Sequence, residues 1–280
     1  MTENIARGGM PPESALLSLR ETLRGEMLRP GDVEYDAIRG IWNGMIDRRP
    51  SLIVRCHGVA DVIDAVNFAC NHGLLVAIRG GGHGVAGHAV CDGGMMIDLS
   101  SMRAVRVDPR ALRAWVQGGA TWGDVDCETT AFGLATPGGL ISTTGVGGLT
   151  LSGGVGWLRG TAGLCVDNVM SADVVTADGR LLRASETENP DLYWAIRGGG
   201  GNFGIVVGFE FRLRPIEPLL MFCAAIYPEI RAPELLLQWR DFMTAAPEQL
   251  SSLAEFSTIP DDPEYPEVAR GQRVLALAAV

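Results

Sequence analysis

Clustered glycines constrain this chain more than any other feature of its sequence. The chain holds 37 glycines in 280 residues, roughly twice the ordinary usage of about 7%. They gather at places such as residues 80–82, 145–148 and 198–201, without a collagen-like period. Glycine lets a backbone adopt positive φ angles and approach another group closely. The clusters therefore predict places where the main chain itself contacts a ligand or a neighbouring segment.

Charge and apolar patterning exclude several classes of partner. The formal net charge is −10 and no basic cluster occurs. Neither nucleic acid nor an anionic membrane is expected, because both need a concentrated positive surface, so we expect a small-molecule substrate. The N-terminal segment lacks the features of a signal peptide, and no run reaches the ~20 apolar residues that span a bilayer. We therefore expect a cytoplasmic protein, with no prediction of its oligomeric state.

The cysteines are widely spaced and form no C-x-x-C pair. In a cytoplasmic protein of this size such residues are usually reduced and packed in the core. We therefore expect buried free thiols at Cys56, Cys70, Cys91, Cys127, Cys165 and Cys223.

Hydrophobic periodicity predicts an α+β fold. Apolar residues at helical spacing predict helices at residues 12–27, 59–73, 121–133, 190–197 and 232–245. Short apolar runs bounded by turn residues predict strands at residues 51–57, 74–79, 93–102, 204–216, 220–228, 251–259 and 272–280, and hairpins at residues 104–119 and 171–185. Because a strand, a helix and a strand follow one another over residues 51–79, we expect a β-α-β unit there.

Two prolines, Pro215 and Pro218, indicate a domain boundary. We expect an N-terminal helical lead-in at residues 1–50, one domain at residues 51–214, and the start of a second domain at residues 215–280. The last predicted strand stops in mid-pattern, so we expect the second domain to be incomplete.

The segment RGGGHG at residues 79–84 follows the end of a predicted strand. Residues 82–87 satisfy G-x-G-x-x-G, but no predicted helix follows to hold a pyrophosphate, so the match is interpreted as accidental. A P-loop is excluded because no Gly-Lys-Ser or Gly-Lys-Thr occurs.

Successive glycine N–H groups can still form an anion-binding concavity, with Arg79 at its entrance. A plain tight turn is the alternative.

Two other kinds of site are not predicted. His83 and His88 lie near Cys91 and Asp92, but the surrounding glycines disfavour the helix that would place both histidines on one face for a metal. The glycine-rich residues 135–163 are long enough to be a functional loop. They contain no G-x-S-x-G elbow, so we predict no hydrolase site at Ser142, Thr143, Thr144 and Ser152.

Four segments in order resemble the FAD-linked oxidases of the berberine bridge enzyme type, within the vanillyl-alcohol oxidase superfamily. They are RGGGH at residues 79–83, TPGGLISTTGVGGLTLSGGVGWL at 136–158, GLCVDNVMSADVVTADG at 163–179 and NPDLYWAIRGGGGNFGIVVGFEFRL at 189–213. Each is weak alone, but the combination is specific. The resemblance implies a PCMH-type FAD-binding domain of two α/β subdomains, followed by the start of an α+β substrate domain.

The resemblance also implies that FAD is bound covalently through His83. In the family, the histidine of this motif is bonded to the 8α-methyl carbon of the flavin, and a neutral imidazole is a competent nucleophile near neutral pH. Members with two links also have a cysteine four residues before the G-x-G-G segment. That position is Ile141 here, and Cys165 lies beyond the segment, so we expect a single attachment. Thr144 lies where the family places a residue that controls oxygen access.

Further cofactor contacts are implied position by position. The resemblance predicts that FAD is held by Arg79, Gly80, Gly81, Gly82, His83, Gly84, Gly87, Pro137, Gly138, Gly139, Leu140, Thr143, Gly145, Gly148, Gly153, Asn168, Val169, Gly204 and Val206. For Asn168, a capping or turn role is the alternative. For Trp122, Trp157 and Trp194 we expect core packing.

The implied activity is that of an FAD-dependent oxidoreductase. It transfers a hydride from a C–H bond of an alcohol, an amine or a sugar-like substrate to covalently bound FAD, and then passes electrons to oxygen or another acceptor. The family's catalytic base comes from the domain that is incomplete here, so none is assigned, and Tyr227 is expected to be a packing residue. The alternatives are a flavin- or nucleotide-binding module without turnover, and a non-covalent flavin reductase that uses NAD(P)H.

Overall fold

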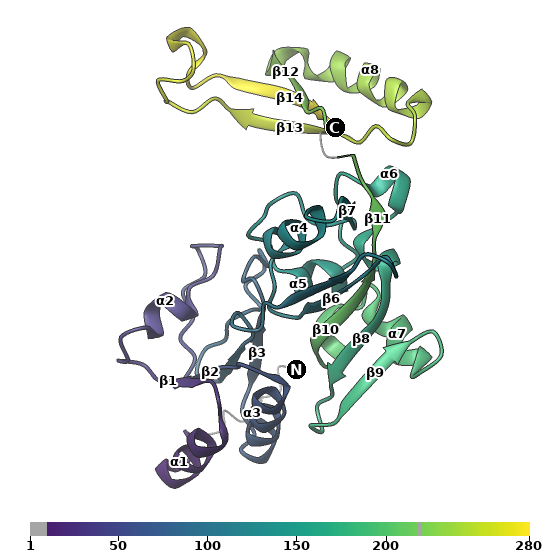
Figure 1. Cartoon of the computed structure of the whole chain (residues 1–280). Helices are drawn as coiled ribbons and strands as arrows, with labels where there is room; N and C mark the ends of the chain where they lie inside the picture. Colours follow the sequence, from purple (N-terminus) through teal and green to yellow (C-terminus); the bar gives the residue numbers. More distant parts are fainter. Residues whose placement is uncertain (1–9, 218–219) are drawn as a thin grey trace, which may run out of the picture. The chain divides into compact units, whose positions relative to one another are not determined.

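A computed structural model describes residues 10–217 and 220–280. The described chain forms two compact units. The first contains the described residues up to Gly156 together with Leu164–Ile216, and the second contains Trp157–Gly163 and the described residues from Glu217 onward. The first unit is built around two sheets, and the second around one (Figure 1).

The first sheet has the strand order β1-β2-β4-β3. Its strands are β1 (Glu26–Leu28), β2 (Leu52–Arg55), β4 (Met95–Asp98) and β3 (Val76–Arg79). β2 and β3 both run parallel to β4, which lies between them, and β1 pairs antiparallel with β2. Three parallel strands therefore end at the same edge of the sheet, and the loops that follow them meet there.

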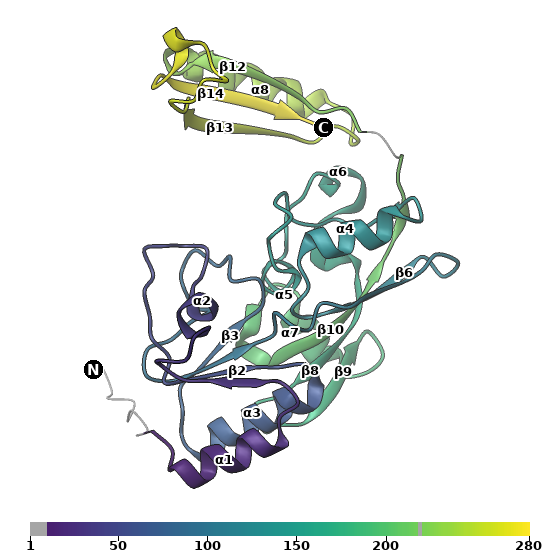
Figure 2. The same ribbon diagram turned by 60° about the vertical axis from the view of Figure 1, so that its left-hand side comes forward.

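Helices cover both faces of this sheet. On one face lie α1 (Glu13–Thr22) and α3 (Val59–Asn71), which run side by side (Figure 2), while α2 (Tyr35–Arg39) covers the other. Successive strand residues point to opposite faces, so Leu52 and Val54 pack toward α3 whereas Ile53 packs toward α2. Burial on both faces explains the continuous apolar run of β2.

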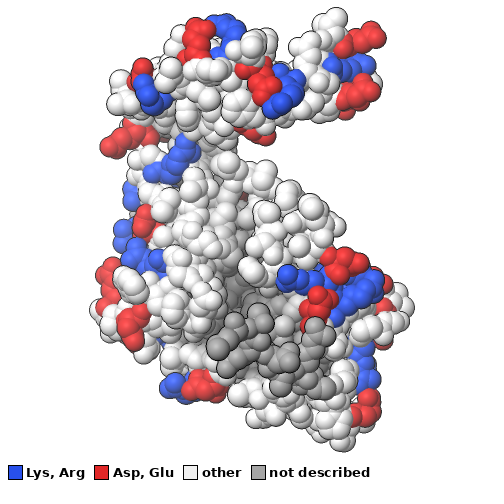
Figure 3. Space-filling model, turned by 180° about the vertical axis from the view of Figure 1, so that it is seen from behind, with Lys and Arg blue, Asp and Glu red and all other residues white. Residues whose placement is uncertain are grey.

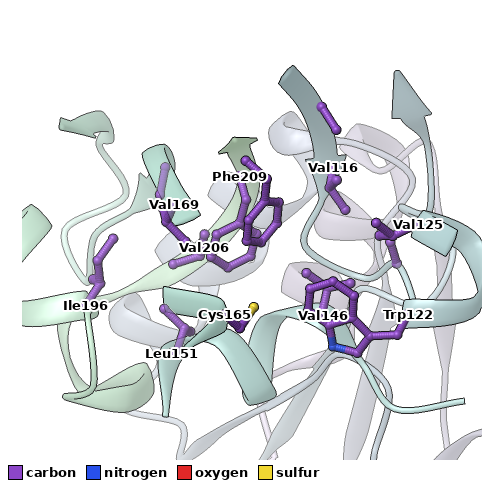
Figure 4. Close-up of a cluster of buried hydrophobic side chains, with 14 of the residues drawn as sticks. Val116, Trp122, Val125, Val146, Leu151, Cys165, Val169, Ile196, Val206 and Phe209 are labelled. Carbon is purple, nitrogen blue, oxygen red and sulfur yellow. The ribbon is translucent and has the colours of Figure 1, made fainter. Parts of the chain in front are cut away.

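The second sheet is antiparallel, with the order β5-β6-β10-β8-β9. Its strands are β5 (Val105–Asp108), β6 (Arg113–Gln117), β10 (Ile205–Arg212), β8 (Val169–Val175) and β9 (Leu181–Ser185). The helices α4 (Trp122–Thr130), α5 (Val146–Leu151) and α7 (Pro190–Ile196) contribute to the core on one of its faces. The fully buried Trp122 indole lies there beside Val125 and Val146 (Figure 4). A two-stranded pair of β7 (Leu134–Ala135) and β11 (Arg214–Pro215) completes this unit.

The second unit contains a three-stranded antiparallel sheet with the order β12-β14-β13. Its elements are β12 (Cys223–Pro228), α8 (Ala232–Ala245), β13 (Ser252–Thr258), β14 (Arg273–Ala279) and the short helix α6 (Arg159–Ala162). The small core joins Ala232 and Leu235 of α8 to Leu275 of β14. Within this unit, Trp157 also contacts the ring of Phe222, with 6.3 Å between ring centroids.

The structure confirms the predicted α+β fold, both hairpins and the β-α-β unit, although β4 intervenes between its two strands. The leading helix is shorter than predicted, because it ends at Thr22 and the lead-in then contributes β1 to the first sheet. Residues 1–9 and Pro218 lie outside the described residues.

Two burial predictions are wrong in part. All six cysteines are free, but Cys70, Cys127 and Cys223 are exposed. Trp122 is fully buried as predicted, Trp157 is half-buried, and Trp194 is 78% exposed. Trp194 points outward because α7 buries the face that carries Tyr193 and Ile196, three residues apart.

Charge is distributed without a single-sign area on the face drawn in Figure 3, where acidic and basic side chains are interspersed. Within the described residues, no helix is both long enough and apolar enough to cross a membrane.

Candidate functional site

Arg79 is the last residue of β3 and is fixed beneath the glycine loop. Its Nη1 donates to Oδ1 of Asp98 at 3.3 Å, and its Nη2 donates to the carbonyl of Gly40 at 3.4 Å. Asp98 is fully buried at the end of β4 and also accepts from the backbone N–H and the hydroxyl of Ser100. A buried carboxylate with several donors is a rigid anchor, so the positive charge of Arg79 is held at this edge of the sheet.

The loop that follows presents a row of free backbone donors. Within the described chain, none of the N–H groups of residues 80–84 donates a hydrogen bond to another group. Gly82 adopts a left-handed φ of 69°, and the buried Nε of Arg79 beneath it has no hydrogen-bond partner among the described residues. Buried donors are normally satisfied. Free N–H groups in a turn of this kind, next to an arginine, form a concavity that suits an anion such as a phosphate.

Three glycine-containing segments approach one another closely through their backbones. The first is the loop with Gly81, the second contains Gly145 and the third contains Gly118. A Cβ placed on Gly81 would lie 2.3 Å from the nitrogen of Gly145, and one on Gly145 would lie 2.3 Å from the nitrogen of Gly81. A Cβ on Gly118 would lie 2.2 Å from the carbonyl oxygen of Val206. The N–H of Val146 donates to the carbonyl of Ala120 at 2.8 Å, which links the second and third segments. Only glycine permits these approaches, so the wall of the site is mostly main chain.

The His83 side chain has a defined orientation beside these segments. It is half-buried, and its Nε2 lies 2.9 Å from the hydroxyl oxygen of Thr143. The Trp42 indole stacks on its ring, with 5.7 Å between ring centroids and 19° between ring planes. The backbone N–H of Trp42 donates to the carbonyl of Gly82 at 3.0 Å, which ties the stacking residue to the glycine loop. The imidazole is therefore held at one edge and on one face.

Two further buried polar atoms lack partners beside the second glycine segment. Within the described residues, Nε1 of Trp122 and Oγ1 of Thr136 have no hydrogen-bond partner. The Trp122 ring lies against Gly138, where a Cβ would come within 2.3 Å of it, and also against Gly139. An unsatisfied buried donor or hydroxyl often indicates a missing ligand or water. These atoms extend the candidate site from the anion loop toward residues 136–139.

The structure brings some of the predicted site residues together. Gly81 lies against Gly145, Gly82 against Arg79 and Gly118 against Val206, and His83 contacts Thr143. Gly148 is exposed on α5, with nothing within 4 Å of an added Cβ, and Leu140 is 45% exposed. These residues lie where a bound group could contact them.

Five other residues predicted to bind the cofactor have roles in the fold itself. Gly87 turns the chain at φ 74° against Ile46, Gly153 ends α5 at φ 101°, and Gly204 bends the start of β10 at φ 143°. Asn168 is buried and donates from Nδ2 to the carbonyl of Leu164, as the turn alternative predicts. The carbonyl of Val169 accepts from the Tyr193 hydroxyl at 2.7 Å. No contact described for these five residues requires a cofactor.

Sequence reasoning missed four residues of the site. Trp42 and Asp98 orient His83 and Arg79, and Gly118 and Gly119 provide the third glycine segment. The pair Gly118-Gly119 follows directly after strand β6, as residues 80–82 follow β3. Two glycines directly after a strand could therefore have predicted that Gly118 and Gly119 belong to the site. Nothing in the local sequence predicts that Trp42 lies beside His83.

Neither a metal-binding cluster nor a reactive Cys165 thiol is found at the site among the described residues. His83 and His88 belong to no group of three or more His, Cys, Asp or Glu side chains that could hold a metal within the described residues. Burial raises the pKa of the Cys165 thiol to about 12, so this group stays protonated and is a poor nucleophile.

Comparisons with known proteins agree with this geometry. An FAD-binding domain family matches residues 50–185. Among curated proteins, (R)-6-hydroxynicotine oxidase of Paenarthrobacter nicotinovorans is 42% identical over 200 residues, which cover 71% of this chain and 44% of the relative. The FAD-linked oxidoreductase pgmH of Aspergillus terreus is 40% identical over 76% of this chain and 44% of the relative. The chain thus spans about half the length of such relatives or slightly less.

Solved structures show the same likeness. The crystal structure of 6-hydroxy-D-nicotine oxidase from Arthrobacter nicotinovorans matches with a TM-score of 0.82 and 34% identity, over 92% of this chain and 55% of that one. The berberine bridge enzyme-like protein 1 of Physcomitrella patens matches with a TM-score of 0.82 and 25% identity, over 94% of this chain and 56% of that one. The similarity therefore extends beyond the matched domain in both sequence and fold.

Proposed function

The chain is a member of the FAD-linked oxidoreductases of the berberine bridge enzyme-like type, and from this membership we propose that it oxidises a small molecule. The proposed reaction transfers a hydride from a C–H bond of an alcohol, an amine or a sugar-like substrate to FAD. Because the chain spans about half of its relatives' length, the activity, the substrate and the domain boundaries at residues 50 and 214 are all part of this proposal.

One observation carries the proposal: among the described residues, neither the N–H groups of residues 80–84 nor the buried Nε of Arg79, which lies beside Gly82, has a hydrogen-bond partner. FAD contains a pyrophosphate, whose oxygens are hydrogen-bond acceptors that need several donors in one concavity. The main-chain wall formed by Gly81, Gly118 and Gly145 lets a large planar group lie close to the backbone. The residues present therefore fit this cofactor.

We propose that His83 forms the single covalent bond to the flavin. His83 lies next to the anion loop and is oriented by Thr143 and Trp42, and a neutral imidazole is a suitable nucleophile. Ile141, at the position of the second link in doubly attached relatives, carries no nucleophile and is 59% exposed. The buried Cys165 thiol is unsuited to replace it.

When bound, the flavin would supply the two-electron chemistry. The chain's own residues hold and orient it: the loop N–H groups and Arg79 would bind the pyrophosphate, and the backbone of residues 143–147 would line the path of the rings. Gly87, Gly138, Gly153, Asn168, Val169 and Gly204 would act mainly by shaping these loops. Tyr227 is half-buried against the core of the second unit, under Arg231, and is not proposed as the catalytic base.

The relatives' names suggest the substrate class. They include a hydroxynicotine oxidase, which acts on an amine, a chitooligosaccharide oxidase, and a glucose oxidase variant. We therefore propose an amine, alcohol or sugar-like substrate, with oxygen as acceptor and Thr144 as the residue beside its access path. The cytoplasmic location stays a prediction from sequence.

Anaerobic reduction tests the activity. The full chain, loaded with FAD, is mixed with panels of amines, alcohols and sugars without oxygen, and the visible flavin absorbance is followed. Bleaching by one class, reversed by air, is the expected result. Bleaching only by NAD(P)H would instead support a reductase, and no bleaching by any compound would support a binding module without turnover.

A further inference from the structure

A short segment of the lead-in, residues 40–49, binds carbonyl groups of the glycine loop. The backbone N–H of Trp42 donates to the carbonyl of Gly82 at 3.0 Å. Nδ2 of Asn43 donates to the carbonyl of Val85 at 2.8 Å. Two carbonyls of the loop are therefore bonded to the same lead-in segment.

Arg48 continues this contact further along the chain. Its Nη1 donates to the carbonyl of Gly87 at 3.0 Å and to that of Val90 at 3.2 Å. Among the described residues, no carboxylate pairs with Arg48, and the side chain is half-buried. Hydrogen bonds from a charged donor are stronger than those between neutral groups, so these two carbonyls are held firmly toward the lead-in segment.

The bonds also fix the direction of the N–H groups in the same peptides. A trans peptide is planar, and its C=O and N–H point to opposite sides, and the described chain contains no cis peptide. Three of the four bonded carbonyls belong to peptides whose N–H groups come from His83, Ala86 and His88. Within the described chain, none of these N–H groups donates to another group. They point away from the lead-in segment and stay available to a ligand.

The loop has little backbone restraint of its own. Within the described residues, one backbone hydrogen bond lies inside residues 80–88, from the N–H of Gly87 to the carbonyl of Gly84 at 3.0 Å. Glycine gives a backbone wide conformational freedom, so the loop alone would sample several directions for its N–H groups. Ordering a loop on binding lowers affinity, and a loop already held in its bound conformation avoids this loss. The lead-in segment supplies that restraint from outside the loop.

We propose that Asn43 and Arg48 are positioning residues of the cofactor site, which hold carbonyls of the loop outward so that its N–H groups face the pyrophosphate. This inference rests on the proposed binding of FAD at the loop. It adds a part of the chain to the site, because the lead-in segment precedes residues 50–185, which match the FAD-binding domain family.

The test compares two probes that differ in the pyrophosphate. ADP-ribose contains a pyrophosphate but no flavin ring, so covalent attachment of a flavin does not interfere, and adenosine lacks the pyrophosphate. Their dissociation constants are measured by calorimetry on the full chain without FAD, for wild type, Asn43→Leu and Arg48→Gln. We expect the constant for ADP-ribose to rise about fivefold in Asn43→Leu and about tenfold in Arg48→Gln, from the loss of one and two hydrogen bonds. The constant for adenosine should stay at the wild-type value in both.

Three further features make the test specific. Met45→Ala changes a side chain of the same segment that is 91% exposed, and it should bind both probes like wild type. Asn43→Leu alters no charge, so its effect cannot come from a weaker attraction for an anion. Arg48→Lys keeps the charge and a donor, and should recover part of the affinity that Arg48→Gln loses.

Contrary results separate this inference from the proposed function. Equal losses for ADP-ribose and adenosine would show a general disturbance of the fold and overturn the positioning role. Wild-type affinity for ADP-ribose in Asn43→Leu would also overturn it, even with a loss in Arg48→Gln, because the charge of Arg48 alone would then explain that loss. Wild type that binds ADP-ribose no more tightly than adenosine would refute the pyrophosphate site itself, and with it the observation that carries the proposed function.

Discussion

Two glycine-rich regions of the molecule use the same residue for different purposes. In the loop of residues 80–84, the N–H groups are free, and a Cβ on Gly84 would meet nothing within 4 Å. In residues 136–156, a Cβ on Gly145 would meet the Gly81 nitrogen at 2.3 Å, and one on Gly156 would meet the Gly138 carbonyl oxygen at 1.9 Å. Gly84 of the first region leaves space open for a ligand, while Gly81, Gly145 and Gly156 admit neighbouring backbone.

Glycine content alone therefore does not identify a binding loop. Alanine at a closed position should cost stability, because backbone atoms cannot move aside. Alanine at an open position should not cost stability, and in the loop of residues 80–84 it should weaken cofactor binding. Gly145 is a closed position where the two regions touch.

The largest effect is expected for Gly145→Ala. Its new methyl group would overlap the backbone of Gly81, and separating the two segments would disturb the whole wall of the site. We expect the free energy of unfolding to fall by about 3 kcal/mol, at the upper end of overpacking effects. Urea unfolding followed by circular dichroism measures this. A loss below about 0.5 kcal/mol, the range of ordinary surface changes, would show that the two segments do not touch as described.

Gly138→Ala should have a smaller effect on stability. The clash is with the Trp122 ring at 2.3 Å, and a side chain can shift where a backbone cannot, although this indole is fully buried. We expect a loss of about 1–2 kcal/mol, with a change in tryptophan fluorescence. An unchanged unfolding midpoint would mean that position 138 is open, as in the first region.

Gly84→Ala should separate binding from stability. The added methyl group meets no protein atom within 4 Å and the residue is exposed, so stability should stay within about 0.5 kcal/mol of wild type. The methyl group would enter the space above the free N–H groups, and we expect the dissociation constant of FAD to rise about tenfold. Titration of the apoprotein measures it. Wild-type affinity would place the pyrophosphate elsewhere.

Gly148→Ala is expected to have the smallest effect. Gly148 belongs to the second region by sequence, yet it is exposed on α5 with nothing within 4 Å. Alanine favours a helix over glycine, so stability should rise by about 0.5 kcal/mol. A fall in stability would contradict the open geometry, and a simultaneous loss of FAD affinity would assign this position to the cofactor wall.

The fold was predictable where periodicity was strong. The helix α3 and the hairpin of β8 and β9 follow from apolar spacing and from Asp178-Gly179 at the turn. The strand β1 was not, because three partly exposed residues carry no periodic signal. The place of β4 between β2 and β3 could not be predicted either, because β2 and β3 pair with β4 through tertiary contacts and not with each other.

The site was predictable from its motif and not from its contacts. The residues from Arg79 to His83 stand out in the sequence, but the approach of Gly81 to Gly145 joins segments far apart in the chain. The stacking of Trp42 on His83 likewise depends on how the lead-in folds over the loop. Trp194 shows the converse error, because a large apolar residue was expected inside although the short α7 buries a different face.

We propose that His83 carries the flavin beside an anion loop built from free backbone donors. Intact mass and the visible spectrum of denatured chain test it most directly, with wild type compared with His83→Ala. We expect a wild-type mass increased by one FAD and a yellow denatured protein, and a colourless His83→Ala at the mass of the bare chain. A colourless wild type at that mass, or an adduct that persists in His83→Ala, would contradict it.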